Sequence, residues 1–210
     1  MNAKISKEYI ASLLPNNPIV LEAGARFGKD TKRMSLLWPQ GHIHTFEPVP
    51  ALYKQLFELS QTLPNVTCYN MALADKIGTL ELHVSSGQSD ACSSLLAPHL
   101  CLEERPLITF HETIMVPVTT IDAWAAHYNV AKLDFLWLDL QGAELLALKG
   151  AEHMLNTVQV IQVEVNRTER YKHAPLYDDI ITFLNARGFK LNQEAFHHET
   201  WGDALFIRAS

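Results

Sequence analysis

The chain has 210 residues and a mass of 23.7 kDa, and 48% of its residues are apolar while 19% are charged. These values exclude the class of disordered chains, which combine low hydrophobicity with high charge, and they suit a single domain over residues 1–210. The formal net charge is −6 and no block is rich in Lys or Arg. We therefore expect no nucleic-acid partner held mainly by phosphate contacts.

The cysteine and hydropathy patterns predict in which cellular compartment the protein is found. Cys68, Cys92 and Cys101 are odd in number and show no ligand spacing, so we expect free thiols in a reducing environment. The first residues lack an apolar core of the kind that signal peptides carry, and no apolar run is long enough to span a bilayer. The pattern therefore predicts a soluble, cytoplasmic protein without a membrane span.

The first half of the chain alternates strands and helices. Residues 5–14, within an N-terminal segment 1–17, have helical spacing of their apolar residues, and Pro15 and Pro18 end the helix. Predicted strands follow at 18–24, 42–48 and 65–73, with predicted helices at 29–38 and 50–62. This order is typical of parallel strands joined by crossover helices.

The pattern changes in the middle of the chain. Residues 78–84 alternate apolar and polar side chains and predict an extra, half-exposed strand. Residues 85–118 show little periodicity until the run TIMVPV, and we interpret them as an inserted loop that covers the substrate. Ser89, Ser93 and Ser94 of this insertion either hydrogen-bond a ligand or only solvate the loop.

The alternation resumes in the second half. The predicted elements are a helix at 119–128, a strand at 133–140, a helix at 142–155, a strand at 158–166, a helix at 177–188 and strands at 189–196 and 201–210. The last two strands are joined by HHETWGD, which is too short for a crossover and so predicts a hairpin. We therefore expect an otherwise parallel sheet that contains one antiparallel strand.

The run VLEAGARFG places a glycine turn after the first strand. A dinucleotide fingerprint would need glycines where Arg26 and Lys29 stand, and no GK[ST] of a phosphate-binding loop follows. The remaining pattern is E-x-G-x-x-x-G, formed by Glu22, Gly24 and Gly28. It suits a cofactor that carries an amino acid in place of a phosphate.

The ends of the next strands add the rest of a cofactor site. Glu47 ends the second strand, where a carboxylate of a doubly wound fold accepts hydrogen bonds from ribose hydroxyls. Asn70 and the backbone of Met71 and Ala72 are placed to face an adenine edge, and an acid-lined mouth favours a cationic sulfonium. These features predict S-adenosylmethionine, bound by Glu22, Gly24, Ala25, Gly28, Asp30, Glu47, Pro48, Asn70, Met71, Ala72 and Asp139.

Some of these residues have a plainer interpretation. Gly28 is equally suited to close packing, Asp30 to a charge partner of a helix N-terminus, and Glu47 to a solvated strand end.

The chain resembles the FkbM family of S-adenosylmethionine-dependent methyltransferases over residues 18–208. The resemblance depends on VLEAGARFGKDT, HTFEPVP, NMALADKIGTLEL, VPVTTIDAW and above all LDFLWLDLQGAELLALKGAEHML. In the last block the family pattern is matched by Asp139, Gly142, Glu144, Leu148 and Gly150. Gln141, however, stands where the family commonly has Glu.

This resemblance implies an α/β, Rossmann-like class I methyltransferase fold. Its mostly parallel seven-stranded sheet has the order 3-2-1-4-5-7-6, with the last strand antiparallel and helices on both faces. The resemblance also implies O-methylation of a hydroxyl on a sugar or natural product, which makes a small-molecule or glycan acceptor the expected partner.

An aliphatic hydroxyl is a poor nucleophile, so a base that takes its proton would help. Ligands of open α/β sheets lie beyond the carboxyl ends of the strands, which makes Asp139, Glu164 and His198 the candidate bases, with His197 as a substitute. Plainer roles are a cap or cofactor contact for Asp139, a solvated strand end for Glu164, and ordinary hairpin residues for the histidines. A divalent metal near Asp139 and Glu164 is possible, since hard cations take carboxylate oxygens, but it is not favoured because Gln141 is neutral.

Three functions remain open at this stage. The first is an S-adenosylmethionine-dependent O-methyltransferase, and the second is a cofactor-binding but inactive relative that acts as a partner or regulatory protein. A nicotinamide oxidoreductase is the third, and Arg26 argues against it because its side chain stands where pyrophosphate would approach the backbone.

Overall fold

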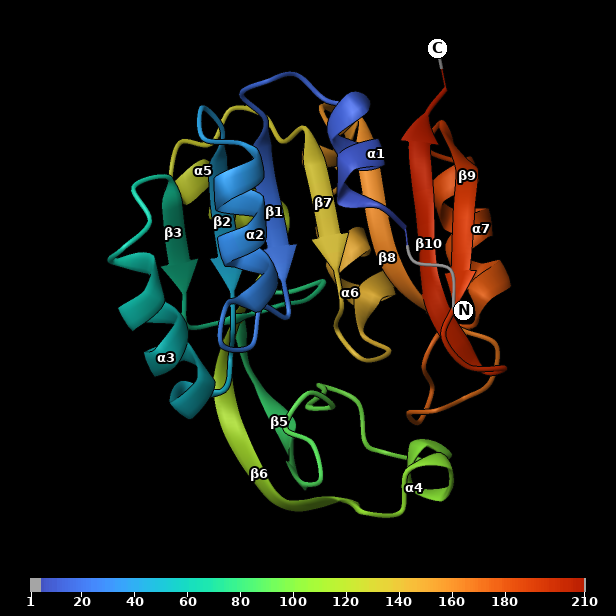
Figure 1. Ribbon diagram of the computed structural model, residues 1–210. Coiled ribbons are helices and arrows are strands. Elements are labelled where there is room, and N and C mark those ends of the chain that lie inside the picture. The colour runs from blue at the N-terminus through green and yellow to red at the C-terminus, as the bar shows by residue number, and fades with distance from the viewer. Residues whose placement is uncertain (1–4, 210) are drawn as a thin grey trace.

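The computed structural model describes residues 5–209 and contains two β-sheets (Figure 1). The larger sheet has seven strands in the order β3-β2-β1-β7-β8-β10-β9, and the smaller has three in the order β4-β6-β5. The ends of the predicted single domain, residues 1–4 and 210, lie outside the described residues. Residues 1–4 belong to the predicted N-terminal segment, and residue 210 ends the last predicted strand.

The seven-stranded sheet has the predicted topology. Its strands are β1 (Ile19–Ala23), β2 (His42–Phe46), β3 (Val66–Tyr69), β7 (Phe135–Leu138), β8 (Val160–Asn166), β9 (Phe189–Phe196) and β10 (Trp201–Arg208). β10 runs antiparallel to β8 and β9, and the other neighbouring pairs are parallel. Counted along the chain within this sheet, the order is 3-2-1-4-5-7-6, and the prediction is confirmed.

Helices cover both faces because successive side chains of the central strands point to opposite sides. Val20 packs in one core with Met34 of α2, whereas Leu21 packs in another with Trp124 of α5. Residues of α1 and α2 fill the first core, and residues of α5, α6 and α7 fill the second. The helices are α1 (Lys7–Ser12), α2 (Lys29–Leu37), α3 (Pro50–Ser60), α4 (Cys101–Glu104), α5 (Ile121–His127), α6 (Glu144–Lys149), the 3₁₀ helix η1 (Met154–Asn156) and α7 (Tyr177–Asn185).

The predicted helix at 142–155 is divided in the structure. α6 ends at Lys149, and Gly150 approaches the neighbouring backbone so closely that a Cβ on it would lie 2.2 Å from the carbonyl oxygen of Ala74. The carbonyl oxygen of Gly150 also accepts a hydrogen bond from Asp122 N at 2.9 Å. These contacts anchor the chain against α5, and the single turn η1 follows.

The prediction that residues 85–118 form a loop is wrong for much of their length. β5 (Gly78–Gly87) extends past the predicted strand and pairs antiparallel with β6 (Ile108–Thr119). β4 (Ala72–Leu73) pairs with the end of β6. Only residues 88–107, which include α4, remain as a connection. Figure 1 shows the β5–β6 ribbon and this connection beyond the carboxyl ends of the central strands.

Within residues 5–209, no helix combines the length and the apolar character that crossing a bilayer would require.

Candidate functional site

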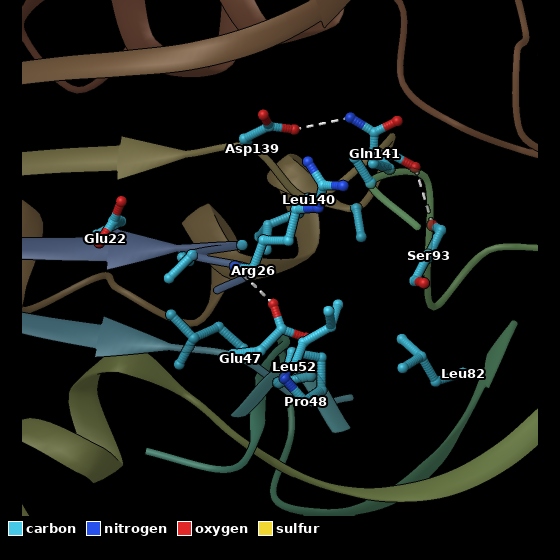
Figure 2. A pocket seen from close by; sticks show the side chains of 18 of the residues that line it. Glu22, Arg26, Glu47, Pro48, Leu52, Leu82, Ser93, Asp139, Leu140 and Gln141 are labelled. Carbon is cyan, nitrogen blue, oxygen red and sulfur yellow. Dashed lines mark hydrogen bonds between the residues drawn. The ribbon is translucent and has the colours of Figure 1, made fainter. Parts of the chain in front are cut away.

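A cavity of about 300 Å³ lies at the carboxyl ends of β1, β2 and β7, and residues 90, 91 and 93–95 of the connection line its outer side. Figure 2 shows Glu47 and Asp139 on opposite sides of this cavity, with Arg26 between them. The lining carries more acidic than basic residues. It includes the acids Glu22, Asp30, Glu47, Asp90 and Asp139 and the bases Arg26 and Lys29.

The glycine turn after β1 is built by close backbone contacts. Gly24 has φ +86°, and a Cβ on it would lie 1.9 Å from the carbonyl oxygen of Asp139. The N–H groups of Gly24 and Ala25 both donate to the carbonyl oxygen of Phe46 at 3.1 Å. Only glycine accommodates this conformation at this distance, so the turn brings the ends of β1, β2 and β7 together.

Gly28 has a different role. It has φ +87° and precedes α2, and a Cβ on it would lie 2.6 Å from Leu59 and 2.8 Å from Leu56 of α3. Gly28 does not line the cavity. Its position therefore favours the packing interpretation over direct cofactor contact.

Glu47 is held in place by the backbone. Its two carboxyl oxygens accept hydrogen bonds from Arg26 N and Val49 N, each at 2.8 Å. Burial raises the pKa of Glu47 to about 7. A carboxylate oxygen can accept more than one hydrogen bond, so the group keeps capacity for hydroxyls of a ligand.

The residues after β3 divide between support and lining. Asn70 Nδ2 donates to the carbonyl oxygens of Glu47 at 2.9 Å and Pro48 at 3.1 Å, and Met71 packs against the core. Neither lines the cavity, whereas Pro48 and Ala72 do. Asn70 thus supports the chain at the end of β2. Pro48 and Ala72 contribute apolar surface to the cavity wall.

Glu22 lies within β1 behind the turn and is 4% exposed. Its Oε2 accepts hydrogen bonds from the Thr31 hydroxyl at 2.5 Å and the Thr45 hydroxyl at 2.9 Å. Burial raises the pKa of Glu22 to about 7. The two threonines therefore join β1 to α2 and β2 through one buried carboxyl group.

We expect Glu22→Gln to flatten the pH dependence of stability. Below pH 4.5 the group is protonated in both the folded and unfolded states, and the stability that its raised pKa contributes is lost as the pH rises through 7. Between pH 4.5 and pH 7 the free energy of unfolding should therefore fall by roughly 1–3 kcal/mol more in the wild type than in the variant. Urea unfolding at a series of pH values measures this difference. Glu81→Gln, at an exposed position of β5, is the control. Equal slopes for wild type and Glu22→Gln would contradict the expectation.

Asp139, at the end of β7, is the exposed carboxylate of the cavity. Its Oδ1 accepts a hydrogen bond from Gln141 Nε2 at 2.7 Å (Figure 2). The same nitrogen donates to Glu164 Oε2, and Gln141 Oε1 accepts from the Tyr171 hydroxyl at 3.0 Å. Gln141 therefore connects the two predicted bases of the strand ends.

Glu144 holds the turn that carries these residues. Its Oε1 accepts hydrogen bonds from Leu140 N at 2.8 Å and Gly142 N at 3.2 Å, and burial raises its pKa to about 7. Gln141 between them has φ +53°, a conformation that is uncommon for residues with a side chain. The glutamate thus fixes a turn that directs the Gln141 side chain towards Asp139.

Glu164 is buried in β8 and does not line the cavity. Its Oε1 lies 3.3 Å from Nη1 of Arg170, whose Nε donates to Glu104 of α4 at 2.8 Å. Arg170 is only 1% exposed. Sequence reasoning missed Arg170 and Tyr171, because both lie in a polar stretch that looks like an ordinary loop.

The histidines of the hairpin lie away from the cavity lining. His198 is exposed, and its Nδ1 is 2.8 Å from the Thr200 hydroxyl. His197 Nε2 is 2.8 Å from Asp203 Oδ2. Neither histidine lines the cavity. The geometry therefore favours Asp139 over His198 and His197 as the group that meets a substrate.

The connection formed by residues 88–107 contributes serines and one acidic residue to the cavity. Ser93 and Ser94 line the cavity, and Ser94 Oγ donates to the carbonyl oxygen of Gln141 at 2.8 Å. Ser89 is outside the lining and accepts from Ala91 N at 3.2 Å. Asp90 forms an ion pair with Arg26, so the connection is tied to the glycine turn.

Across residues 5–209, no group of three or more His, Cys, Asp or Glu side chains is arranged to hold a metal ion.

A seven-stranded sheet with this order, its single antiparallel strand and a cavity at the carboxyl ends of its first strands define the class I methyltransferase fold. Residues 22–191 match the Methyltransferase FkbM domain. The chain therefore belongs to the FkbM methyltransferase family.

Two methyltransferases of similar sequence agree with this family assignment. The chain is 26% identical over 174 residues to the 2-O-methyltransferase NoeI of Sinorhizobium fredii, covering 80% of this chain and 72% of that protein. It is 26% identical over 211 residues to the methyltransferase sdnD of Sordaria araneosa, covering 89% and 79%.

A solved structure shares the fold. The methyltransferase FkbM from Methylobacillus flagellatus superposes with a TM-score of 0.60 at 12% identity. The match covers 93% of this chain, which spans only 45% of that structure.

Proposed function

We propose that this protein transfers a methyl group from S-adenosylmethionine to a hydroxyl group of a sugar or natural-product acceptor. The observation that carries the proposal is the acid-lined cavity in which Glu47 and Asp139 flank the glycine turn. Family membership supports methyl transfer, and the 2-O-methyltransferase NoeI supports an oxygen acceptor.

The residues of the cavity fit the methyl donor. Glu47 would accept the ribose hydroxyls, since its carboxyl group is already oriented by two backbone N–H groups. Pro48 and Ala72 provide apolar surface for the adenine ring. Near Gly24, where no side chain intrudes, Asp139 would attract the ammonium and sulfonium charges. When bound, the donor supplies an electrophilic methyl carbon on a positively charged sulfur.

Asp139 would act on the acceptor. The bound donor would supply the methyl group to the hydroxyl oxygen and would leave as a neutral thioether. Asp139, as the exposed carboxylate of the cavity, would take the hydroxyl proton, so that the acceptor would become a methyl ether and Asp139 would be protonated. Positioning of the oxygen against the methyl group would supply most of the remaining rate enhancement.

The outer side of the cavity supports a hydroxylated acceptor. It is lined by Asp90, Ser93 and Ser94, which offer hydrogen-bonding groups, beside the apolar Leu82 and Leu95. At about 300 Å³ the cavity lies at the lower end of ligand pockets, so one small ligand would fill it. The acceptor would then approach from the side that residues 88–107 cover.

The experiment is a methyl-transfer assay with donor labelled in its methyl group and a panel of sugars, glycosides and polyketide alcohols. The proposal expects label in a base-stable methyl ether. Binding of S-adenosylhomocysteine without transfer to any hydroxyl in the panel would favour the alternative, a cofactor-binding but inactive partner or regulatory protein.

A further inference from the structure

The amide of Gln141 has a partner for each of its groups. An amide offers two N–H donors on nitrogen and a carbonyl acceptor. Nε2 donates to Asp139 at 2.7 Å and to Glu164, while Oε1 lies 3.0 Å from the Tyr171 hydroxyl. The opposite orientation would turn the carbonyl oxygen towards two carboxyl groups. The partners therefore fix which way the amide points.

The shared nitrogen places the two carboxyl groups next to each other. Asp139 comes from the end of β7 and is exposed, whereas Glu164 comes from β8 and is 3% exposed. Two carboxylates this close repel each other, and the buried one is the costlier to ionise. Burial, together with the charge and hydrogen bonding of Asp139, raises the pKa of Glu164 well above its usual value.

Other charged groups face this pair from the surrounding elements. Glu144 of α6 adds to the negative field at Glu164, and Arg170 from the loop after β8 opposes it. Asp203 of β10 pairs with Glu164 in the strand register, is engaged by His197, and has a pKa that burial raises. Arg170 also contacts Glu104, so its positive charge is shared between two acids.

We propose that Gln141 is a positioning residue that joins Asp139 and Glu164 into one carboxyl pair holding a single proton. Glu164 keeps the proton inside the protein, and Asp139 remains the ionised member that faces the cavity. The inference rests on the proposed function only in giving Asp139 the role of base. The pairing itself follows from the contacts of one amide.

The neutral amide is essential to this arrangement. Its two N–H groups stabilise negative charge on the pair without adding any charge of their own. A glutamate at this position would place a third carboxyl group between Asp139 and Glu164 and would have no N–H to donate. Like charges raise the pKa of neighbouring acids, so the pair would then release its proton only at higher pH.

The test is a pH titration of the whole protein, with Asp and Glu labelled with ¹³C at their side-chain carboxyl groups and followed by NMR. Signals are assigned by their loss in Asp139→Asn and Glu164→Gln. In the wild type we expect the Glu164 signal to titrate well above the usual pKa of a glutamate, and we expect the chemical shift of the Asp139 carboxyl carbon to change in the same step, as it does in coupled groups.

The variant Gln141→Glu should move the titration of the pair upwards by about one pH unit or more. Gln159→Glu, an exposed position on the surface, is the matched control and should leave the pair unchanged. Gln141→Leu removes both N–H donors without adding a charge and should also move the titration of Glu164 to higher pH. Circular dichroism confirms that each variant is folded.

Two results would overturn the pairing. One is a Glu164 signal that titrates near the usual pKa of a glutamate in the wild type, in a step to which the Asp139 signal does not respond. The other is an unchanged titration in folded Gln141→Leu or Gln141→Glu. Methyl transfer is measured separately, so a protein that shows the coupled titration but transfers no methyl group would refute the proposed function and leave the pair established.

Discussion

Replacing Asp139 with asparagine should lower kcat by roughly 10²- to 10⁴-fold, because asparagine has nearly the same shape but cannot take a proton from the acceptor. Asparagine Oδ1 can still accept the hydrogen bond from Gln141, so the turn should keep its geometry. Affinity for S-adenosylhomocysteine should therefore change by no more than about tenfold. Steady-state methyl transfer and calorimetry on the same preparation measure the two effects.

The matched control for this variant is Asp75→Asn, which removes an exposed carboxylate outside the cavity. It should leave both kcat and affinity unchanged. If the Asp139→Asn enzyme keeps its kcat and loses only affinity for S-adenosylhomocysteine, Asp139 orients the cofactor and is not the base.

Replacing Glu47 with glutamine should weaken the affinity for S-adenosylhomocysteine by about 100-fold, since hydrogen bonds to a charged carboxylate contribute more than those to an amide. The variant also gives up one of the two oxygens that accept from Arg26 N and Val49 N. Calorimetry at pH 8 measures the change, and Glu81→Gln is the control.

The pH dependence gives a second readout for Glu47. Burial raises its pKa to about 7, so the carboxylate becomes protonated as the pH falls through 7 and loses acceptor capacity. Wild-type affinity should fall between pH 8 and pH 6, and this part of the dependence should be absent in Glu47→Gln. A wild-type affinity that is constant over this interval, or equal affinities of the two proteins, would show that Glu47 does not bind the ligand.

The main sheet could be predicted from the sequence because its central strands are buried on both faces and therefore appear as continuous apolar runs. LDFLWLDL is one such run, and the turn chemistry after each strand marks its end. The positions of Glu22, Glu47 and Asp139 at the cavity follow from the same rule, since strand ends of a parallel sheet meet at one edge.

The β5–β6 ribbon could not be predicted in the same way. β6 carries His111, Glu112 and Thr113 on exposed positions and Pro117 near its end, so its apolar alternation is interrupted. Its stability depends on pairing with β5 and on packing of Val116 and Val118 against residues distant in the sequence.

The network behind Asp139 was hidden for a related reason. An arginine in a polar stretch normally predicts an exposed side chain. Arg170 is buried because Glu104 and Glu164, which approach it from α4 and β8, compensate its charge. Such a charge balance exists only after the chain has folded, so no local sequence pattern predicts it. Gln141 was visible in the sequence as a departure from the family, but its contacts to two carboxyl groups were not.

The most direct test of the account is a crystal structure of the protein with S-adenosylhomocysteine. In that structure we expect the ribose hydroxyls at Glu47, the homocysteine part beside Gly24 and the sulfur on the side of the cavity that faces Asp139. A ligand bound elsewhere, or one whose ribose does not contact Glu47, would contradict this expectation.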